Sequence, residues 1–402
     1  MSTISSSTTS TTAYKVTADT TGALVLQTGA TPTTAVTIDT SQNTTLAGYL
    51  NAPNTFGFKN RIINGAMVID QRNAGASVTP VNIQYSVDRW QSFVSAASKF
   101  TIQQNAGSVT PPTGFTNYLG ATSSSAYSLA AGDYFTIQQR IEGYNVSDLN
   151  FGKASAATIT VWFWVRSSLT GTFGGALSNG AQDRGYPFTY TISSANTWEQ
   201  KSVTIAGDTS GTWITNNGIG MFVIFSLGTG ATYSGTAGAW AGAALLSATG
   251  ATSVVGTNGA TWYVTGVQLE KGSTATSFDY RPYGTELALC QRYYFKMQAD
   301  DTAYQFAPVS ADSATRGYAT GTFPVTLRTT PSALEQSGTA SQYTVRTGGV
   351  DRASSTVPAF ASTTTQYVWV VETTVASGQT AGLGGIFYGQ STSAYLGWSA
   401  EL

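Results

Sequence analysis

The chain has 402 residues with 19 basic and 20 acidic side chains, no histidine and one cysteine. The net charge of −1 removes the electrostatic basis of a dedicated nucleic-acid binder. The absence of histidine excludes a Ser-His-Asp triad, a Cys-His dyad and a His-ligated metal. Hydrophobic residues make up 41% of the chain, enough for packed cores. No apolar run of about 18 residues predicts a membrane span.

The first segment, residues 1–58, is predicted to attach the protein to a partner. Residues 2–12 are Ser or Thr apart from Ile4, so this tract cannot bury enough apolar surface to order itself and is predicted to be flexible. Two short alternating runs, Leu24–Gln27 and Ala35–Asp39, follow turn residues and predict a hairpin or small sheet. So few large apolar side chains would hardly support an independent domain.

Residues 59–284 are dense in aromatic residues and in strand-like runs separated by Gly, Asn and Ser turns. Helical periodicity is nearly absent, so an all-β antiparallel sandwich or jelly roll is predicted. The predicted strands are 100–104, 134–142, 158–166, 188–192, 201–205, 219–227 and 261–270.

Residues 285–402 are predicted to form a short helical linker and a smaller β-sandwich at the far end of the chain. Thr285 is expected to cap the helix, with Glu286 in its first turn. Cys290 lies in this helix beside leucines, which indicates a buried free thiol acting as a small hydrophobe. Strands are predicted over 316–325, 342–346, 366–372 and 394–401.

An ordered series of motifs then resembles a known family. It runs from Asn60–Asn73 through Ser86–Trp90, Gln138–Gly143, Phe163–Ser168, Trp198–Lys201 and Gly266–Ser273 to Phe278–Tyr294. The series resembles a module of bacteriophage and prophage tail-fibre proteins, including those of cyanophages and other marine phages. That resemblance covers about residues 59–295 and implies a fold like the jelly roll of carbohydrate-binding modules. It also implies a virion protein, made in the host cytoplasm, that is a homotrimer and touches the host cell.

The charged residues favour structural roles over catalysis. Glycan-cleaving enzymes need two carboxyl groups roughly 5–9.5 Å apart. The candidates Asp133, Glu142, Asp148, Asp183 and Glu199 have no paired spacing, so we expect no enzyme and no catalytic residue. No metal ligand and no cofactor is predicted, although the oxygen-rich loop Asn145–Asn150 leaves a structural calcium ion as an alternative to simple turn chemistry.

Arginine and aspartate in the motifs are interpreted as structural clamps. Asp70–Arg72 and Asp88–Trp90 each join an acid and a base. We expect an ion pair or a hydrogen-bond clamp, buried where strands enter the sandwich, and a polar ligand site is the alternative. Arg140, Arg281 and Arg292 are expected to satisfy several carbonyl groups at a domain junction.

The predicted carbohydrate site rests on exposed aromatic rings. Alternation along 158–166 places Ile159, Val161, Phe163 and Val165 in the core. Trp162 and Trp164 then lie on the opposite face beside Thr and Arg, a mixture suited to stacking on a pyranose. The competing platform is a set of aromatic residues in loops: Tyr186, Trp213, Tyr233 and Trp240. A third interpretation is that Trp162 and Trp164 pack against a loop or a neighbouring subunit.

The predicted function is therefore non-catalytic adhesion of a phage fibre to a host surface glycan such as lipopolysaccharide. The expected partners are two further copies of the chain, other virion proteins bound through the N-terminal segment, and the glycan. Nucleic acid and insertion into a membrane are not expected. The alternative is a structural or decoration fibre without a receptor site of its own.

Overall fold

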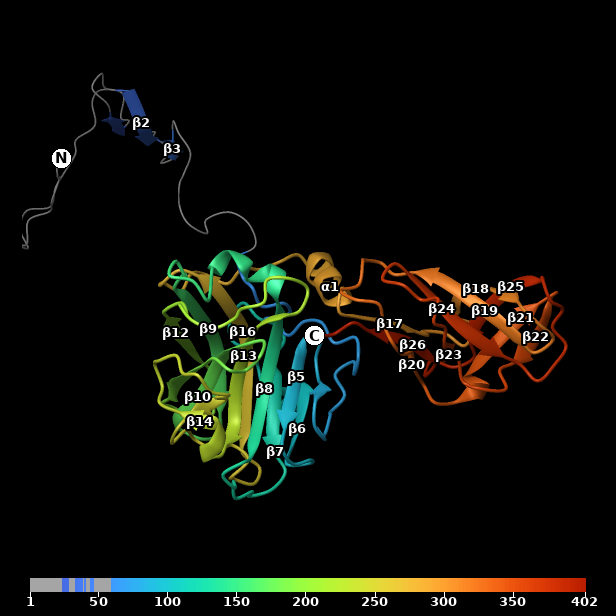
Figure 1. Ribbon diagram of the computed structural model, residues 1–402, viewed down its shortest axis with the longest axis horizontal. Helices are drawn as coiled ribbons and strands as arrows, with labels where there is room; N and C mark the ends of the chain where they lie inside the picture. The colour runs from blue at the N-terminus through green and yellow to red at the C-terminus, as the bar shows by residue number, and fades with distance from the viewer. Residues whose placement is uncertain (1–23, 29–32, 39, 41–43, 47–58) are drawn as a thin grey trace, which may run out of the picture. The chain divides into compact units, whose positions relative to one another are not determined.

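The computed structural model describes residues 24–28, 33–38, 40, 44–46 and 59–402 (Figure 1). The chain divides into two compact units, Met1–Gly57 and Phe58–Leu402. The first unit contains an antiparallel sheet in the order β1 (Leu24–Thr28), β2 (Thr33–Ile38) and β3 (Thr44–Leu46). Val25 and Leu26 are exposed on it. The predicted hairpin is confirmed and gains a third strand, whereas the tract 2–12 lies outside the described residues.

The second unit begins with a β-sandwich of two antiparallel sheets, which confirms the predicted all-β class. The six-stranded sheet has the order β11 (Gly185–Ile192), β10 (Gly171–Asn179), β13 (Ile219–Thr229), β8 (Tyr134–Glu142), β5 (Trp90–Val94) and β4 (Gln84–Tyr85). The five-stranded sheet has the order β12 (Glu199–Ile205), β9 (Ile159–Ser167), β16 (Thr261–Lys271), β7 (Leu119–Ser123) and β6 (Phe100–Gln104). A short parallel pair, β14 (Ser234–Gly235) and β15 (Ser247–Ala248), lies in a long loop.

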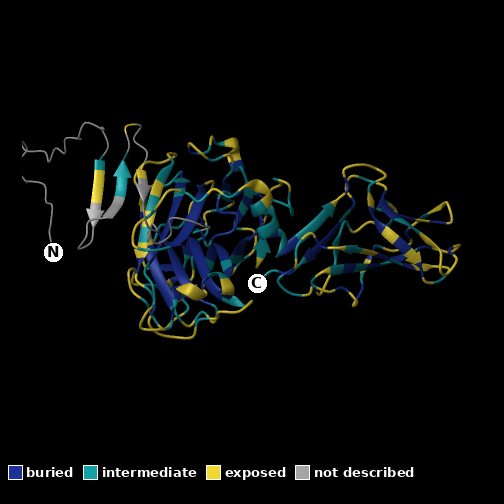
Figure 2. Ribbon diagram, turned by 90° about the horizontal axis from the view of Figure 1, so that it is seen from above, coloured by how far each residue is buried: buried dark blue, intermediate teal, exposed yellow. Residues whose placement is uncertain are grey.

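The core of this sandwich lies between the two sheets, where Figure 2 shows mostly buried strands. Strand β9 carries the predicted alternation: its aliphatic and Phe side chains are buried in the core and exclude water from the space between the sheets. Those side chains are Ile159, Val161, Phe163 and Val165. The prediction of the inward face from period two is therefore confirmed, because successive side chains of a strand point to opposite faces.

The C-terminal part forms a second, smaller pair of sheets around its own core. The larger has the order β22 (Val350–Ala353), β21 (Tyr343–Thr347), β25 (Gly384–Gly389), β18 (Gln305–Ala311), β19 (Arg316–Thr322), β24 (Val368–Thr374) and β23 (Ala359–Phe360). The smaller has the order β17 (Tyr294–Gln298), β26 (Tyr395–Ser399) and β20 (Glu335–Gln336). Trp369 and Trp398 meet in the core with ring centroids 4.9 Å apart.

A single α-helix among the described residues, α1 (Tyr283–Gln291), joins the two β-structures. The helix is confirmed, but the prediction that Thr285 caps it is wrong. Pro282 is the N-cap residue, and the amide of Thr285 already donates to the carbonyl of Pro282. Proline lacks an N–H and fixes its own φ, which suits it to a helix start. Cys290 is fully buried as predicted. No described helix has the length and apolar character to cross a membrane.

Arginine side chains hold the sandwich to the C-terminal part, as predicted for Arg140 and Arg292. Arg89 is buried, whereas Arg140 and Arg292 are half-buried. The guanidinium of Arg292 donates to both oxygens of Glu142, at 2.7 and 3.0 Å, and so joins α1 to the end of β8. Arg89 pairs with Glu401 and donates to the carbonyl of Arg140, whose own guanidinium donates to the carbonyl of Leu402. These contacts tie the last two residues of the chain to the first sandwich.

Candidate functional site

A cavity lies beside the bulge of β16, where Gly65 approaches the carbonyl of Val267 and the ring of Phe115 approaches Gly266. Its volume is about 230 Å³. The residues that line it come from three segments that are distant in the sequence: Asn60, Gly65, Ala66, Val68, Gly114, Phe115, Thr116, Phe278, Tyr280, Arg281 and Glu286. We call this cavity the aromatic pocket.

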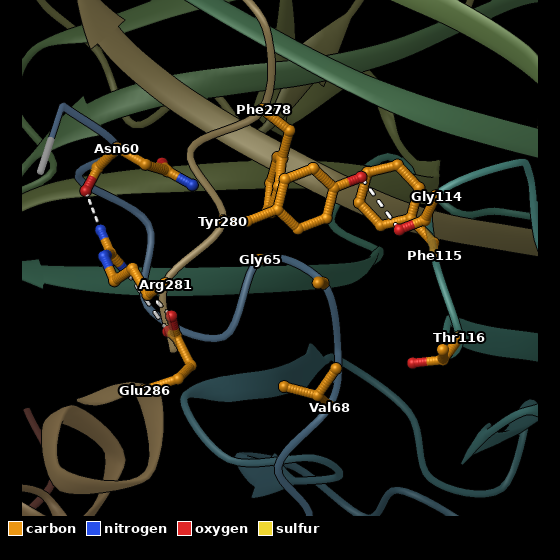
Figure 3. Close-up of a pocket in the computed structure, with 11 residues that line it drawn as sticks. Asn60, Gly65, Val68, Gly114, Phe115, Thr116, Phe278, Tyr280, Arg281 and Glu286 are labelled. Carbon is orange, nitrogen blue, oxygen red and sulfur yellow. Dashed lines mark hydrogen bonds and ion pairs between the residues drawn. The ribbon is translucent and has the colours of Figure 1, made fainter. Parts of the chain in front are cut away.

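Three rings form one side of the aromatic pocket (Figure 3). The centroids of Phe278 and Tyr280 lie 4.8 Å apart with the rings at 73°, and Phe115 lies 5.1 Å from Phe278 and 5.6 Å from Tyr280. Phe115 and Phe278 are half-buried, whereas Tyr280 is 57% exposed. The cluster therefore has a fixed inner part and one ring that remains available to a ligand.

The segment that carries Phe278 and Tyr280 is fixed by polar contacts of the residues between and beside them. The carboxylate of Asp279 accepts from the amides of Lys59 and Asn60, at 2.8 and 3.2 Å. The amide of Asp279 donates to Gln268 of β16 at 2.8 Å. These hydrogen bonds join a segment without regular structure to β16, the central strand of the five-stranded sheet, so the rings are positioned before any ligand arrives.

The loop that carries Phe115 contacts Tyr280 through Gly114, at a spacing that only glycine allows. The hydroxyl of Tyr280 donates to the carbonyl of Gly114 at 2.9 Å. Gly114 has φ +92°, and a Cβ there would lie 2.7 Å from the same hydroxyl oxygen. Only glycine combines this backbone conformation with such close contact. Partial burial raises the pKa of Tyr280 above its ordinary value, so the hydroxyl stays protonated and can donate.

The two charged residues that line the aromatic pocket, Arg281 and Glu286, form an ion pair with each other. Arg281 and Glu286 lie 3.2 Å apart, and both side chains are nearly buried. Arg281 also donates to the carbonyls of Asn60 and Ile62, and Glu286 accepts from the amide of Asn64. Both side chains are thus committed to holding the chain in place. The pocket offers aromatic rings and the hydroxyl of Thr116, which suits binding rather than proton transfer.

The structure places Trp162 and Trp164 on the outer face of the five-stranded sheet, as predicted. The side chain of Phe278, however, covers Trp162. Trp162 is only 3% exposed, and the ring of Phe278 packs on it edge to face at 5.9 Å. The expectation that Trp162 is an open stacking surface is therefore wrong, and the alternative of packing against a segment of the chain holds for it. Trp164 is half-buried between Gln200 and Thr265.

Three of the residues predicted to lie in loops, Tyr186, Trp213 and Trp240, do come together, but the prediction of a loop is wrong for Tyr186, which lies in strand β11. Trp240 lies 5.2 Å from Tyr186 and 5.5 Å from Trp213, and Phe151 packs on both tryptophans. The indole N–H groups of Trp213 and Trp240 donate to the carbonyls of Ser210 and Ala206. A smaller cavity of about 160 Å³ lies beside Phe151 and Trp213. This cluster is anchored to the core. It offers a ligand fewer free groups than the aromatic pocket does, because Tyr186 is buried and both indole N–H groups already donate to carbonyls.

Tyr233 and the loop Asn145–Asn150 lie elsewhere. Tyr233 packs edge to face on Tyr134 at 5.2 Å, on the outer face of the six-stranded sheet. In the loop, Asp148 forms ion pairs with Arg61 at 2.9 Å and with Lys271 at 3.7 Å. Among residues 59–402 and the described parts of 24–46, no group of three or more His, Cys, Asp or Glu could hold a metal ion. The six predicted residues do not form one platform.

Phe115, Phe278 and Tyr280 were missed as site residues by sequence reasoning. Phe278 and Tyr280 belong to the motif Phe278–Tyr294, which marked them as part of a pattern and not as a surface. Phe115 follows Pro111, Pro112 and Gly114, so an aromatic residue in a turn was the available signal. Nothing in the spacing relates it to residues more than 160 positions away.

Comparison with known proteins finds a distant similarity of structure. No protein-family model and no curated protein matches the chain. A CBM4 structure matches with 14% identity over 52% of this chain and 98% of its own, at a TM-score of 0.26. A family 11 carbohydrate-binding module from Clostridium thermocellum, in complex with a β-1,3-1,4-mixed-linked tetrasaccharide, has 10% identity over 50% and 100%, at 0.25. The CBM22-1 xylan-binding domain from Paenibacillus barcinonensis has 10% identity over 51% and 99%, at 0.20.

Proposed function

We propose that this protein binds a saccharide without cleaving it, and that a sugar ring occupies the aromatic pocket. The observation that carries the proposal is the exposed ring of Tyr280, held by Phe115 and Phe278 at the mouth of a cavity of about 230 Å³. Aromatic rings stack on the C–H faces of pyranoses, and nearby carbonyl and hydroxyl groups accept and donate to the sugar hydroxyls. The only buried acid of the pocket, Glu286, is held by Arg281, which supports binding over catalysis.

The biological setting we propose is a phage fibre that adheres to a host surface glycan such as lipopolysaccharide. The ordered motifs between Asn60 and Tyr294 support it, because they resemble those of tail-fibre proteins. In this setting the N-terminal segment binds other virion proteins and the mature protein belongs to the virion. A trimer would link three weak sites and gain about 10²–10⁴ in avidity when they engage together.

Replacing Tyr280 by Ala tests the saccharide site. We expect at least about a tenfold loss of affinity, because the variant removes the exposed stacking surface. The measurement is binding of the purified full chain to a glycan array and to host-cell lipopolysaccharide. Melting temperature is measured beside it, because the variant also loses the hydrogen bond to Gly114 and the ring contacts with Phe115 and Phe278.

Tyr283→Ala is the matched control, because Tyr283 is 64% exposed, lies three positions away and does not line the pocket. Tyr280→Phe keeps the ring and should keep most of the affinity. Unchanged binding by Tyr280→Ala in a folded protein would reject the aromatic pocket. Trp213→Ala would then show whether the smaller cavity beside Phe151 is the site.

We also expect a trimer in solution. The small N-terminal sheet exposes Val25 and Leu26, and a sheet with so little buried surface gains stability from packing against copies of itself. Sedimentation equilibrium of the full chain should give three times the monomer mass at micromolar concentration. A stable monomer would contradict this expectation.

The alternative function is a structural fibre whose faces are occupied by neighbouring virion proteins. The exposed apolar side chains of the N-terminal sheet are compatible with it. A receptor-binding fibre adsorbs to host cells as a purified protein and competes with infection, whereas a structural fibre binds virion components alone. Competition for adsorption therefore separates the two functions.

A further inference from the structure

A third cavity lies where the first sandwich meets the C-terminal sheets. It has a volume of about 390 Å³, larger than the aromatic pocket. The first sandwich and the segment leading into it contribute one wall, and β17, β20 and β26 contribute the other. The lining residues are Arg72, Asn73, Ile83, Gln84, Tyr85, Tyr294, Glu335, Tyr395 and Ser399. We call this cavity the junction groove.

Arg72 lines the junction groove and is held in place by rings and carboxylates. The guanidinium of Arg72 lies 3.5 Å from the ring centroid of Tyr294 and 4.8 Å from that of Tyr85. It also pairs with Glu335 and Glu401, each at 3.4 Å. Its side chain is only 12% exposed. Stacking and ion pairing from both β-structures therefore fix Arg72 in one position, so the groove is formed before any ligand binds.

The walls of the junction groove carry hydrogen-bonding groups with spare capacity. Glu335 is 43% exposed and accepts from the hydroxyl of Tyr294 at 2.8 Å, which leaves further lone pairs on its carboxylate. The side-chain oxygen of Gln84 is buried and has no hydrogen-bond donor. A buried acceptor without a donor is costly, and a ligand hydroxyl would satisfy it once the amide of Gln84 turns toward the groove. Tyr395 adds a half-buried ring.

Charged groups of both signs surround the junction groove, which favours a neutral ligand. Arg72, Arg89 and Lys296 contribute positive charges, and Asp70, Asp88, Glu335 and Glu401 contribute negative ones. The ammonium of Lys296 lies 4.4 Å from the ring centroid of Tyr395 and donates to the carbonyl of Arg72. An anionic ligand would face the carboxylates, and a cationic one the guanidinium groups and the ammonium. A neutral molecule with several hydroxyl groups is not repelled by either set of charges.

We propose that the junction groove is a second saccharide subsite, which binds a neutral sugar unit between the first sandwich and the C-terminal sheets. Rings from both walls contact the sugar face, while Glu335 and Gln84 accept from its hydroxyls. The inference rests on the proposed function, because it assigns the same ligand class to another place. It adds that neither β-structure carries this subsite alone.

The test locates binding on the full chain by hydrogen exchange with mass spectrometry. The probes are neutral oligosaccharides of glucose, galactose, mannose and N-acetylglucosamine, the residues from which a neutral glycan is built. Binding in the junction groove should slow exchange in peptides that cover 81–85 and 335–336. Binding in the aromatic pocket should slow exchange in peptides that cover 114–116 and 278–281.

Variants then separate the two sites. Tyr395→Ala and Glu335→Gln should remove the protection at 81–85 and 335–336 and leave that at 278–281. Gln84→Leu should weaken the groove at least about fivefold without lowering the melting temperature, since the acceptor it removes makes no hydrogen bond. Gln84→Leu also keeps the proposal testable if Tyr395→Ala does not fold. Tyr367→Ala, 61% exposed on the C-terminal part and outside the groove, is the control.

The outcomes distinguish this inference from the proposed function. Protection at 278–281 alone, with no effect of the groove variants, would overturn the junction groove and leave the aromatic pocket in place. Protection at 81–85 and 335–336 with none at 114–116 or 278–281 would support the groove and reject the aromatic pocket. Protection of neither region by any neutral probe would overturn both.

Discussion

Replacing Arg292 by Met should lower the free energy of unfolding by about 3–5 kcal/mol. The variant leaves the carboxylate of Glu142 in place, 1% exposed, with only the hydroxyl of Tyr293 as a donor at 2.6 Å. A buried charge that loses its partner keeps its desolvation cost and loses the attraction that offset it. The measurement is urea unfolding of both proteins near neutral pH.

The exposed pair of Arg316 and Asp312 supplies the control. Both side chains are more than 40% exposed, so Arg316→Met should cost at most about 0.5 kcal/mol. Adding Glu142→Gln to Arg292→Met should restore part of the loss, because it removes the unpaired charge. A loss below about 1 kcal/mol for Arg292→Met would show that water or another cation reaches Glu142, and that this pair does not hold α1 to β8.

Replacing Asp88 by Asn should change how stability depends on pH. Burial raises the pKa of Asp88 from 3.8 to about 6, against hydrogen bonds from the amide and side chain of Gln71 that lower it. The folded protein thus holds this proton more tightly than the unfolded chain. The stability that the group contributes is complete below about pH 4 and is lost as the pH rises through about 6. The difference corresponds to about 3 kcal/mol.

The measured quantity is the unfolding free energy of Asp88→Asn minus that of the wild type, determined at several pH values. This difference should rise by up to about 3 kcal/mol between about pH 4 and about pH 7, because only the wild type loses the contribution. Asp351→Asn gives a control of opposite sign. The hydrogen bond from Arg346 lowers the pKa of Asp351 below 3.8, so there the wild type loses stability as the pH falls below about 4, and the series for this control extends into that range. A flat difference for Asp88→Asn would mean that its carboxyl group is ionised in the folded protein at all these pH values.

Strands with strong local patterns were predictable from the sequence. β8 and β16 combine β-branched and aromatic residues with alternation, and their observed bounds differ from the predicted ones by at most one residue. β10 and β25 were missed because Gly171–Asn179 and Gly384–Gly389 are rich in glycine, which weakens local strand preference. Pairing on both sides makes strands of these segments, since β10 lies between β11 and β13, and β25 between β21 and β18.

The candidate site, like the strands, was predictable from the sequence only in part. Period two along β9 determined that Trp162 lies on the outer face, since alternation is a property of the strand itself. It did not determine whether that face is open. Phe278 covers Trp162 from a position more than 100 residues later, and Phe115 and Tyr280 meet because Asp279, Gly114 and Gln268 fix their segments together.

Composition and local pattern thus determine the all-β class, the abundance of aromatic side chains and the absence of any chemistry that needs histidine. The aromatic pocket and the junction groove arise instead from contacts between segments far apart in the chain. Such contacts depend on register, bulges and the fit of individual rings, and no periodicity within one segment encodes them. For that reason the sequence predicted the kind of side chain that would bind, while the folded chain determined which aromatic residues reach the surface together.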